Sequence, residues 1–289
     1  VYEQFLGKVI RLTAGHQAKV EDKPEVKKAG GVYYTPTYIV EYIVKNTVGK
    51  LLQELASKDK SADKKIIKSV AKLRILDPAC GSGSFLIGAY QFLLDWHRDW
   101  YINDGPEKWA TGKNPTLYQA QGGEWRLTAA ERKRILLNNI YGVDIDPQAV
   151  EVTKLSLLLK VLEGENEQTI SRQLKMFHQR ALPDLANNIK CGNSLIGPDF
   201  YEGRQLSLMD DEERIKINAF DWKTEFKEIM EAGGPARRPV RQNDSEGGSD
   251  SEGGFNAVIG NPPYIRMEAF KELKQYLKAN YDSHGERSD

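Results

Sequence analysis

The stretch Gly260–Ile265 (GNPPYI) places three chemically useful groups directly after an apolar run. Neither Pro262 nor Pro263 can donate to a strand ladder, so the preceding strand must end near Asn261. The amide oxygen of Asn261 and the carbonyl of Pro262 can both accept hydrogen bonds from one –NH2 group. Tyr264 can stack on a planar ring. The pattern therefore indicates either a rigid turn or a pocket for the exocyclic amine of a nucleobase.

The chemistry of such an amine explains why two acceptors are useful. Its nitrogen lone pair is delocalised into the ring, which makes the nitrogen a poor nucleophile. Acceptors that bind both amine protons favour a more tetrahedral nitrogen, whose lone pair can point at an electrophile. A base stacked in a duplex cannot reach the pocket and would have to flip out of the helix.

A glycine loop at residues 77–83 (DPACGSG) follows an apolar strand pattern and precedes a helical pattern. Gly81 and Gly83 allow a sharp turn and a close approach of the backbone to a ligand. The free N–H groups at the start of the next helix favour a polar or anionic group. The spacing matches neither a dinucleotide fingerprint nor a Walker loop. A plain strand-to-helix turn is the alternative.

Two more polar residues follow strand patterns. Asp144 lies near the end of the run YGVDID, at the position where doubly wound folds place an acid for ribose hydroxyls. Asp146 is explained without a ligand, as the N-cap of the next helix. Asn193 offers a donor and an acceptor to a purine edge, although Asn is also a common turn residue. Together these loops indicate a ligand that carries a nucleoside and lies across several strand ends.

The elements that must position these residues alternate between strand and helix. Such alternation predicts an α/β fold with a parallel sheet. We expect strands at residues 73–77, 140–146, 187–191 and 255–260, and helices at 84–102, 147–162 and 268–281. Thr128 and Glu131 form a predicted capping box at the start of a further helix.

The remaining segments are assigned from composition and periodicity. Residues 1–30 read as an amphipathic helix followed by a charged loop, and Thr35 is the expected N-cap of the next helix, with Pro36 at its first position. Residues 103–127 resemble an insertion. Residues 232–254 are rich in Gly and Ser and read as a flexible insertion.

Composition narrows the class of protein without deciding the ligand. The 289 residues are 40% hydrophobic and 28% charged, and 41 basic residues balance 41 acidic ones, so bulk charge argues neither for nor against nucleic acid. The two cysteines, Cys80 and Cys191, fit a reducing cytoplasmic setting and do not make a metal site. No membrane span is expected. The start of the chain reads as a fragment of a longer protein.

Taken in chain order, DPACGSGSF, YGVDID, CGNSLI and NPPY resemble the motif series of adenine-N6 DNA methyltransferases that use S-adenosyl-L-methionine. The stretch GVYYTP, ahead of the glycine loop, resembles the motif that contacts the methionine end of the cofactor. This order resembles the gamma class, as in the methyltransferase modules of type I and single-chain type II-like restriction–modification enzymes. NPPY also occurs in protein-glutamine and some RNA methyltransferases, but GVYYTP and the long spacings favour DNA.

The resemblance implies roles for particular residues. It implies that the methionine portion is bound by Thr35 and by the loop residues Ala79, Cys80, Gly81 and Gly83, with Asp77 ordering that loop. Asp144 would bind the ribose hydroxyls, Ile145 would pack on the cofactor's adenine, and Asn193 would lie near its amine. The catalytic set would be Asn261, Pro262, Pro263 and Tyr264, acting on a flipped adenine of double-stranded DNA without a metal.

The same resemblance implies how the chain is organised. We expect residues 1–70 to form an N-terminal helical segment that carries GVYYTP, and residues 71–289 to form part of a Rossmann-like catalytic domain. The family's sheet has more strands than the four predicted here, and no target-recognition region is expected in this chain. Specificity or restriction subunits of a parent system are possible partners. The alternatives are a protein-glutamine or RNA-base methyltransferase, and a non-catalytic piece that binds cofactor or DNA.

Overall fold

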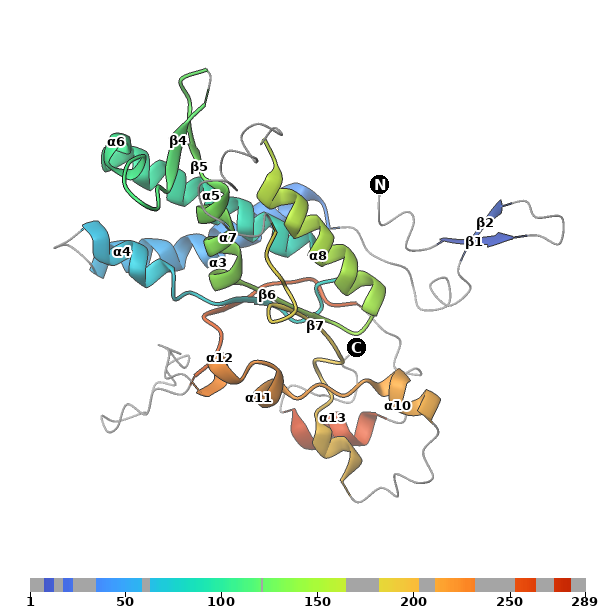
Figure 1. The fold of residues 1–289 in the computed structure, drawn as a ribbon. Coiled ribbons are helices and arrows are strands. Elements are labelled where there is room, and N and C mark those ends of the chain that lie inside the picture. The colour runs from blue at the N-terminus through green and yellow to red at the C-terminus, as the bar shows by residue number, and fades with distance from the viewer. Residues whose placement is uncertain are drawn as a thin grey trace, which may run out of the picture.

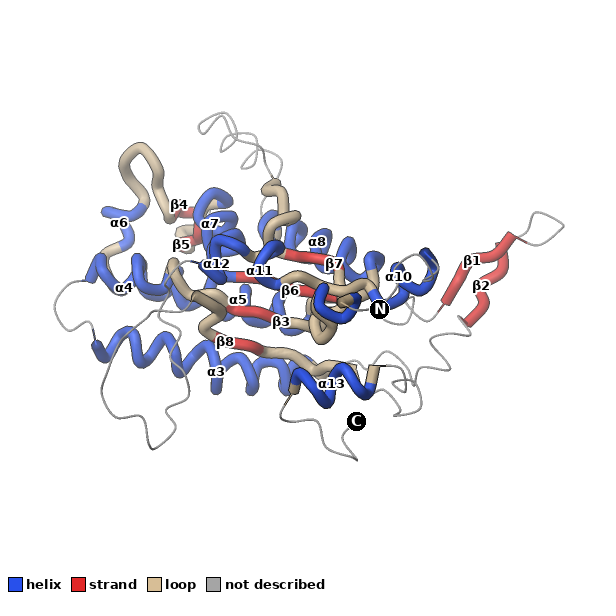
Figure 2. The backbone as a smooth tube through the Cα atoms, turned by 90° about the horizontal axis from the view of Figure 1, so that it is seen from below, coloured by secondary structure: helices blue, strands red, loops and turns tan. Residues whose placement is uncertain are grey.

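A computed structural model describes residues 8–12, 18–22, 35–58, 63–120, 122–164, 182–202, 211–231, 253–263 and 273–281. Its centre is a sheet of four parallel strands in the order β7-β6-β3-β8. Figure 2 shows these strands side by side. They are β3 (Ile75–Asp77), β6 (Ile140–Asp144), β7 (Ile189–Cys191) and β8 (Ala257–Val258). The α/β class and all four predicted strands are therefore confirmed.

One face of the sheet is covered by long helices, which lie above it in Figure 1. They are α3 (Thr37–Lys58), α5 (Ser84–Asn103), α7 (Ala129–Asn139) and α8 (Pro147–Leu162). Ile75, Ile140 and Ile189 of the sheet belong to the same apolar core as Leu86 and Leu93 of α5. The main core therefore lies between the sheet and this helical layer.

The opposite face is covered by shorter helices, below the sheet in Figure 1. They are α10 (Asp211–Ile217), α11 (Trp222–Glu225), α12 (Lys227–Glu231) and α13 (Lys274–Asn280), with a 3-10 turn η1 (Pro198–Tyr201). Leu76 and Tyr141 alternate with the isoleucines along their strands and pack here against Phe220 and Phe226. Burial on both faces explains why the strands read as continuous apolar runs.

Helix α3 packs directly on α5 through two glycines. A β-carbon built on Gly88 of α5 would lie 2.5 Å from Val40 Cγ1, and one on Gly49 of α3 would lie 3.2 Å from Phe92. The lack of side chains at these positions lets the helix axes approach closely. This contact fixes the position of the first turn of α3 relative to α5. Thr35 and Pro36 lie directly before that turn.

The segment at 103–127, expected as an insertion, is ordered and packs beside α5. It contains α6 (Pro106–Trp109) and a hairpin of β4 (Leu117–Gln119) and β5 (Trp125–Leu127). Leu117 and Leu127 are buried in the main core. Before it, α4 (Asp63–Val70) leads from α3 to the sheet.

The predicted helix starts hold with small corrections. Asp146 accepts from Gln148 N at 2.8 Å with Pro147 at the first position, and Thr128 accepts from Glu131 N at 3.3 Å. The return bond of the capping box is not made, because Glu131 instead accepts from Tyr101 and Arg134. Helix α3 begins at Thr37, a little later than the cap predicted at Thr35.

The prediction of a helix within residues 1–30 is wrong where the structure describes them. Lys8–Leu12 (β1) and Ala18–Asp22 (β2) form an antiparallel hairpin instead. The run KVIRL fits both a helical and an alternating pattern over so short a window, and a paired neighbouring strand satisfies its backbone. The predicted flexible insertion lies almost entirely outside the described residues, as do the first residues of the helix predicted at 268–281.

Candidate functional site

The predicted site residues follow the carboxyl ends of all four parallel strands. Adjacent parallel strands end at the same edge of a sheet, so their following loops are brought together there. Asp77 ends β3, Asp144 ends β6, Asn193 follows β7, and Asn261 follows β8. Figure 2 shows the order of these strands, with β3 between β6 and β8. The glycine loop after β3 therefore has the Asp144 loop on one side and the Asn261 loop on the other.

The glycine loop is fixed to the end of β6 by hydrogen bonds that its backbone N–H groups donate to a carbonyl and to a carboxylate. Cys80 N donates to Val143 O at 2.9 Å, and Gly81 N donates to Asp144 Oδ2 at 2.7 Å. Gly83 N closes the turn on Cys80 O at 2.7 Å. Gly81 and Gly83 both have positive φ, 51° and 85°. These left-handed conformations are the physical reason for glycine at both positions.

Thr153 of α8 holds the other side of this loop and was not predicted from the sequence. Its hydroxyl donates to Gly81 O at 2.8 Å, and a β-carbon on Gly83 would lie 2.9 Å from Thr153. Thr153 is fully buried. Its position two turns after the Asp146 cap, on the face toward the sheet, is the signal that could have identified it.

Asp144 organises the next loop with its second oxygen. Asp144 Oδ1 accepts from Asp146 N at 2.9 Å, while Oδ2 binds Gly81 N. Burial raises the pKa of Asp144, and hydrogen bonds from the backbone N–H groups of Asp146, Gly81 and Ile145 act in the opposite direction. Beside it, the side chain of Ile145 is 47% exposed. An ionisable acceptor and an uncovered apolar side chain thus lie next to each other, as the ribose and ring of a nucleoside require.

Asp77 is almost completely buried under the glycine loop. It accepts from Ala79 N at 3.1 Å, and burial raises its pKa to about 7. A β-carbon on Gly260 would lie 2.6 Å from Asp77 Oδ1. Asp77 therefore contacts the glycine loop on one side and the backbone before Asn261 on the other, and its ordering role toward a cofactor stays a prediction.

Asn261 is held from a different direction by Thr35. Asn261 Nδ2 donates to Thr35 Oγ1 at 3.2 Å, across 226 positions of sequence. Asn261, Pro262 and Pro263 are exposed to solvent. The strand β8 is continued by Ile259 N, which donates to Leu76 O at 2.9 Å, and ladder pairing ends before the prolines. Tyr264 lies outside the described residues.

Asn193 has a structural explanation in addition to the predicted role. Its Oδ1 accepts from Leu195 N at 3.1 Å, and its backbone N donates to Asn218 O at 2.6 Å. These bonds build a turn, stabilised below by Phe220, whose ring fills the space where a β-carbon on Gly192 would be. The proximity of Asn193 to a cofactor amine stays a prediction.

The residues present fit the cofactor that the sequence resemblance implies. Open space surrounds Gly81, where a β-carbon would meet nothing within 4 Å. The Asp144 carboxylate has lone pairs left after its two backbone bonds, Ile145 offers an apolar surface, and Thr35 offers a hydroxyl. No group of three or more His, Cys, Asp or Glu side chains that could hold a metal ion is present among the described residues.

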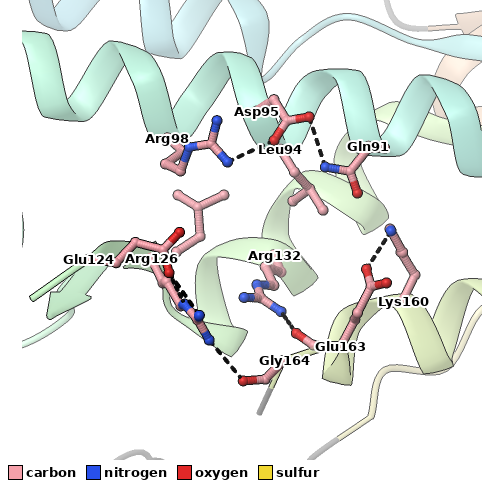
Figure 3. Close-up of a pocket in the computed structure, with 11 residues that line it drawn as sticks. Gln91, Leu94, Asp95, Arg98, Glu124, Arg126, Arg132, Lys160, Glu163 and Gly164 are labelled. Carbon is pink, nitrogen blue, oxygen red and sulfur yellow. Dashed lines mark hydrogen bonds and ion pairs between the residues drawn. The ribbon is translucent and has the colours of Figure 1, made fainter. Parts of the chain in front are cut away.

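Among the described residues, the helical layer borders cavities at two places. A cavity of about 560 Å³ begins at Thr35 and Ser84 and runs between α3 and α5 toward Phe92. A smaller one of about 240 Å³ lies where α5, the β4–β5 hairpin and the end of α8 meet (Figure 3). Its charged side chains are paired: Arg132 donates to Val161 O and Glu163 O, and Arg126 to Gly164 O. Arg126 and Arg132, which line this second cavity, therefore stabilise the end of α8, and their charges are already satisfied within the protein.

A buried polar cluster beside α5 was also not predicted. Tyr101 Oη donates to Glu131 at 2.6 Å, and Arg134 pairs with the same carboxylate at 2.6 Å. His97 is fully buried, with Nδ1 2.8 Å from Leu93 O and Nε2 without a partner. Burial lowers the pKa of His97 to about 4. The cluster is remote from the strand ends and belongs to the scaffold.

Comparison with protein families gives two matches that each cover more than half of the chain. The N-6 DNA Methylase model matches residues 20–178, and the Eco57I restriction-modification methylase model matches residues 138–289. The first spans the glycine loop and Asp144, and the second spans Asp144, Asn193 and Asn261. No helix in the described part of the chain is long and apolar enough to cross a membrane.

Individual proteins that are similar to this chain include restriction enzymes that are also methyltransferases. The chain is 31% identical over 273 residues to the type II restriction enzyme and methyltransferase RM.Eco57I of Escherichia coli. This match covers 94% of this chain and 21% of that protein. The chain is 32% identical over 209 residues to a putative type II restriction enzyme and methyltransferase of Methanocaldococcus jannaschii, covering 63% and 16%. The chain thus spans about a fifth of the length of these relatives.

A solved structure of a nuclease-deletion mutant of the type ISP restriction-modification enzyme LlaGI, in complex with a DNA substrate mimic, is also similar. Identity is 16%, the match covers 81% of this chain and 13% of that chain, and the TM-score is 0.39.

Proposed function

The chain belongs to the N-6 DNA methylase family, and on this basis we propose that the protein containing it transfers a methyl group from S-adenosyl-L-methionine to the N6 amine of an adenine flipped out of double-stranded DNA. We place this activity in a restriction–modification system of the cytoplasm. The printed names of the two relatives, each a restriction enzyme and methyltransferase, support that context. Recognition and restriction regions or subunits would be partners of the module.

The observation that carries the proposal is the contact of the Asn261 loop with both proposed cofactor loops. Gly260 packs on Asp77 under the glycine loop, and Asn261 bonds to Thr35. An amide placed beside a cofactor-binding loop can hold an incoming amine close to a methyl donor. Positioning of this kind can supply much of the catalysis of a transfer between two bound groups.

The roles of the chain's residues follow from this arrangement. We assign the ribose to Asp144, the adenine ring to Ile145 and Asn193, and the methionine portion to Thr35 with the loop Ala79–Gly83. Cys80 lies in that loop with its thiol buried and its pKa raised by burial, so it contributes backbone rather than chemistry. The bound cofactor supplies an electrophilic methyl group on a sulfonium.

At the other side of the site, Asn261 Oδ1 and the Pro262 carbonyl would accept the two protons of the target amine. Pro262 and Pro263 stiffen the loop that presents these acceptors, since each fixes its own φ. We assign stacking on the flipped base to Tyr264. Residues 1–70 would supply Thr35 and the helix that carries it, and residues 71–289 would supply the strand ends.

The proposal is tested by methyl transfer from labelled cofactor to DNA, using the full natural chain that contains this segment. Unmethylated genomic DNA is a suitable substrate because it contains every possible target. RNA and total protein, offered as competitors, separate DNA from the alternative substrates of NPPY enzymes. Asn261→Ala should abolish transfer while the cofactor dissociation constant stays within about threefold, because Asn261 touches the amine. Transfer to RNA or protein instead of DNA would overturn the proposal.

A further inference from the structure

We propose that Thr35 is a positioning residue for Asn261, which fixes the orientation of its amide so that Oδ1 is the atom presented to the substrate. This inference rests on the proposed function and deepens it. It assigns to Thr35 a task at the substrate side of the site, in addition to any contact with the cofactor. The observation behind it is the 3.2 Å hydrogen bond from Asn261 Nδ2 to Thr35 Oγ1.

An Asn side chain can present two different faces to a substrate. Its oxygen accepts hydrogen bonds and its nitrogen donates them, and the two are exchanged by a half-turn about the last side-chain bond. An amine with two protons to donate needs the oxygen. If the nitrogen faced it, donors would oppose donors. An exposed Asn such as Asn261 therefore needs a second contact that selects one orientation.

Thr35 provides that selection through a lone pair of its hydroxyl. By accepting from Nδ2, it leaves Asn261 Oδ1 as the free end of the amide. The hydroxyl has only one proton, and once that proton is given to another acceptor, Thr35 can offer only lone pairs to Asn261. A negatively charged group bound on the other side of Thr35, such as a cofactor carboxylate, would accept the hydroxyl proton. Thr35 would then act only as an acceptor toward Asn261.

The backbone on both sides of this bond is anchored, which keeps the two side chains within hydrogen-bonding distance. Thr35 precedes Pro36, whose carbonyl accepts from Ile39 N at 2.9 Å as α3 begins. Helix α3 is fixed on α5 by the Gly88–Val40 contact. Gly260 rests on Asp77, one residue before Asn261. The hydroxyl and the amide are therefore held by two segments far apart in the sequence, the start of α3 and the end of β8.

The test compares Thr35→Val, which keeps the shape and removes the hydroxyl, with Thr35→Ser, which restores it. Methylated adenines in treated genomic DNA first identify the target sequence. At saturating cofactor and target DNA, Thr35→Val should lower kcat about 10- to 100-fold, and Thr35→Ser should restore it to within about threefold of the unchanged protein. A hydroxyl deletion elsewhere on α3, Thr47→Val, is the control and should leave kcat unchanged, because Thr47 Oγ1 donates within its own helix, to Ile43 O at 2.7 Å and Val44 O at 3.4 Å.

A second readout does not depend on turnover. With target DNA that carries 2-aminopurine in place of the adenine and with S-adenosylhomocysteine at saturation, fluorescence reports capture of the flipped base. Thr35→Val should reduce capture as much as Asn261→Ala does, and adding Thr35→Val to Asn261→Ala should reduce it no further. Independent, additive losses would overturn the inference, as would a normal kcat in Thr35→Val.

The inference and the proposed function fail in different ways. If the unchanged protein does not methylate adenine in DNA, the proposed function fails. In that case the side-chain amide resonance of Asn261 still tests the bond, because it should shift in Thr35→Val and return in Thr35→Ser. If the unchanged protein is active but Thr35→Val retains full kcat, the function stands and the positioning role is overturned.

Discussion

Gly260 and Asp77 are in such close contact that a β-carbon on Gly260 would lie 2.6 Å from Asp77 Oδ1. The residue before the proposed catalytic amide thus rests on the buried acid of the glycine loop. Neither partner can move freely, because Asp77 also accepts from Ala79 N. The distance between the loops that would bind methyl donor and acceptor is set by this contact.

We expect Gly260→Ala to reduce methyl transfer by about tenfold or more, because the added methyl must push the Asn261 loop away from Asp77 and small displacements of reacting groups are costly. The rate of transfer to DNA at saturating cofactor measures this. Gly122→Ala is the matched control, since a β-carbon there meets nothing within 4 Å. Full activity in Gly260→Ala would show that the contact does not set the geometry.

Gly88→Ala should destabilise the protein by about 1–3 kcal/mol through overpacking against Val40. The added β-carbon would lie 2.5 Å from Val40 Cγ1, in the interface of α3 with α5. Combining it with Val40→Ala removes the clash, so the double variant should be more stable than the sum of the single changes predicts. Urea unfolding measures all three variants. Simple additivity would argue against close packing of α3 at this point.

Asp144→Asn should weaken cofactor binding about tenfold or more. The two carboxylate oxygens each accept from a backbone N–H, Gly81 on one and Asp146 on the other. An amide has one oxygen, so its nitrogen would oppose one of these donors and loosen the loop. Calorimetry with S-adenosylhomocysteine measures the change. Asp146→Asn is the control with nearly unchanged affinity, because Asn caps a helix as well as Asp, and equal affinities in both variants would contradict the role of Asp144.

Two buried groups should give opposite pH dependences of stability. Burial lowers the pKa of His97 from 6.5 to about 4, so the folded state resists its protonation and its contribution to stability grows as pH rises from 4 to 6.5. Burial raises the pKa of Asp77 from 3.8 to about 7, so the folded state resists its ionisation and its contribution falls as pH rises through that range.

Removing the carboxyl group of Asp77 should reveal the pH dependence of stability that His97 contributes. In Asp77→Asn, the free energy of unfolding should rise with pH between 4.5 and 6.5 more steeply than in the unchanged protein, by up to about 1.4 kcal/mol per pH unit. Urea unfolding at a series of pH values measures this slope. The same slope in both proteins would mean that Asp77 does not titrate differently in the folded and unfolded states.

Most of the sheet could be predicted from the sequence because three of its four strands have a clear local signal at their ends. Continuous apolar runs stop at Asp77, at Asp144 and before Pro262, so strand, end and loop are all marked by residue type. The start of α5 at Ser84 followed from the two glycines before it. For the same reason, the acid and amide side chains could be placed at the ends of parallel strands, while their roles toward a ligand stay predictions.

Other features depend on contacts between distant segments and have no local signal. The bond between Thr35 and Asn261 joins residues 226 positions apart, and the start of α3 is placed by packing on α5, where Gly88 lies close to Val40. Thr153 reads as an ordinary helical residue until α8 is placed over the glycine loop. The β1–β2 hairpin was misread because a short apolar run fits two periodicities, and only its pairing partner decides between them.

The order of strands in the sheet differs from their order in the chain, and this has a consequence for synthesis. A ribosome completes β3, β6 and β7 well before it reaches β8, the strand that joins β3 from the other side. At about 5–20 residues per second, the interval lasts several seconds. During that time a nascent chain can assemble the half of the site assigned to the methyl donor, while the half that would receive the acceptor does not yet exist.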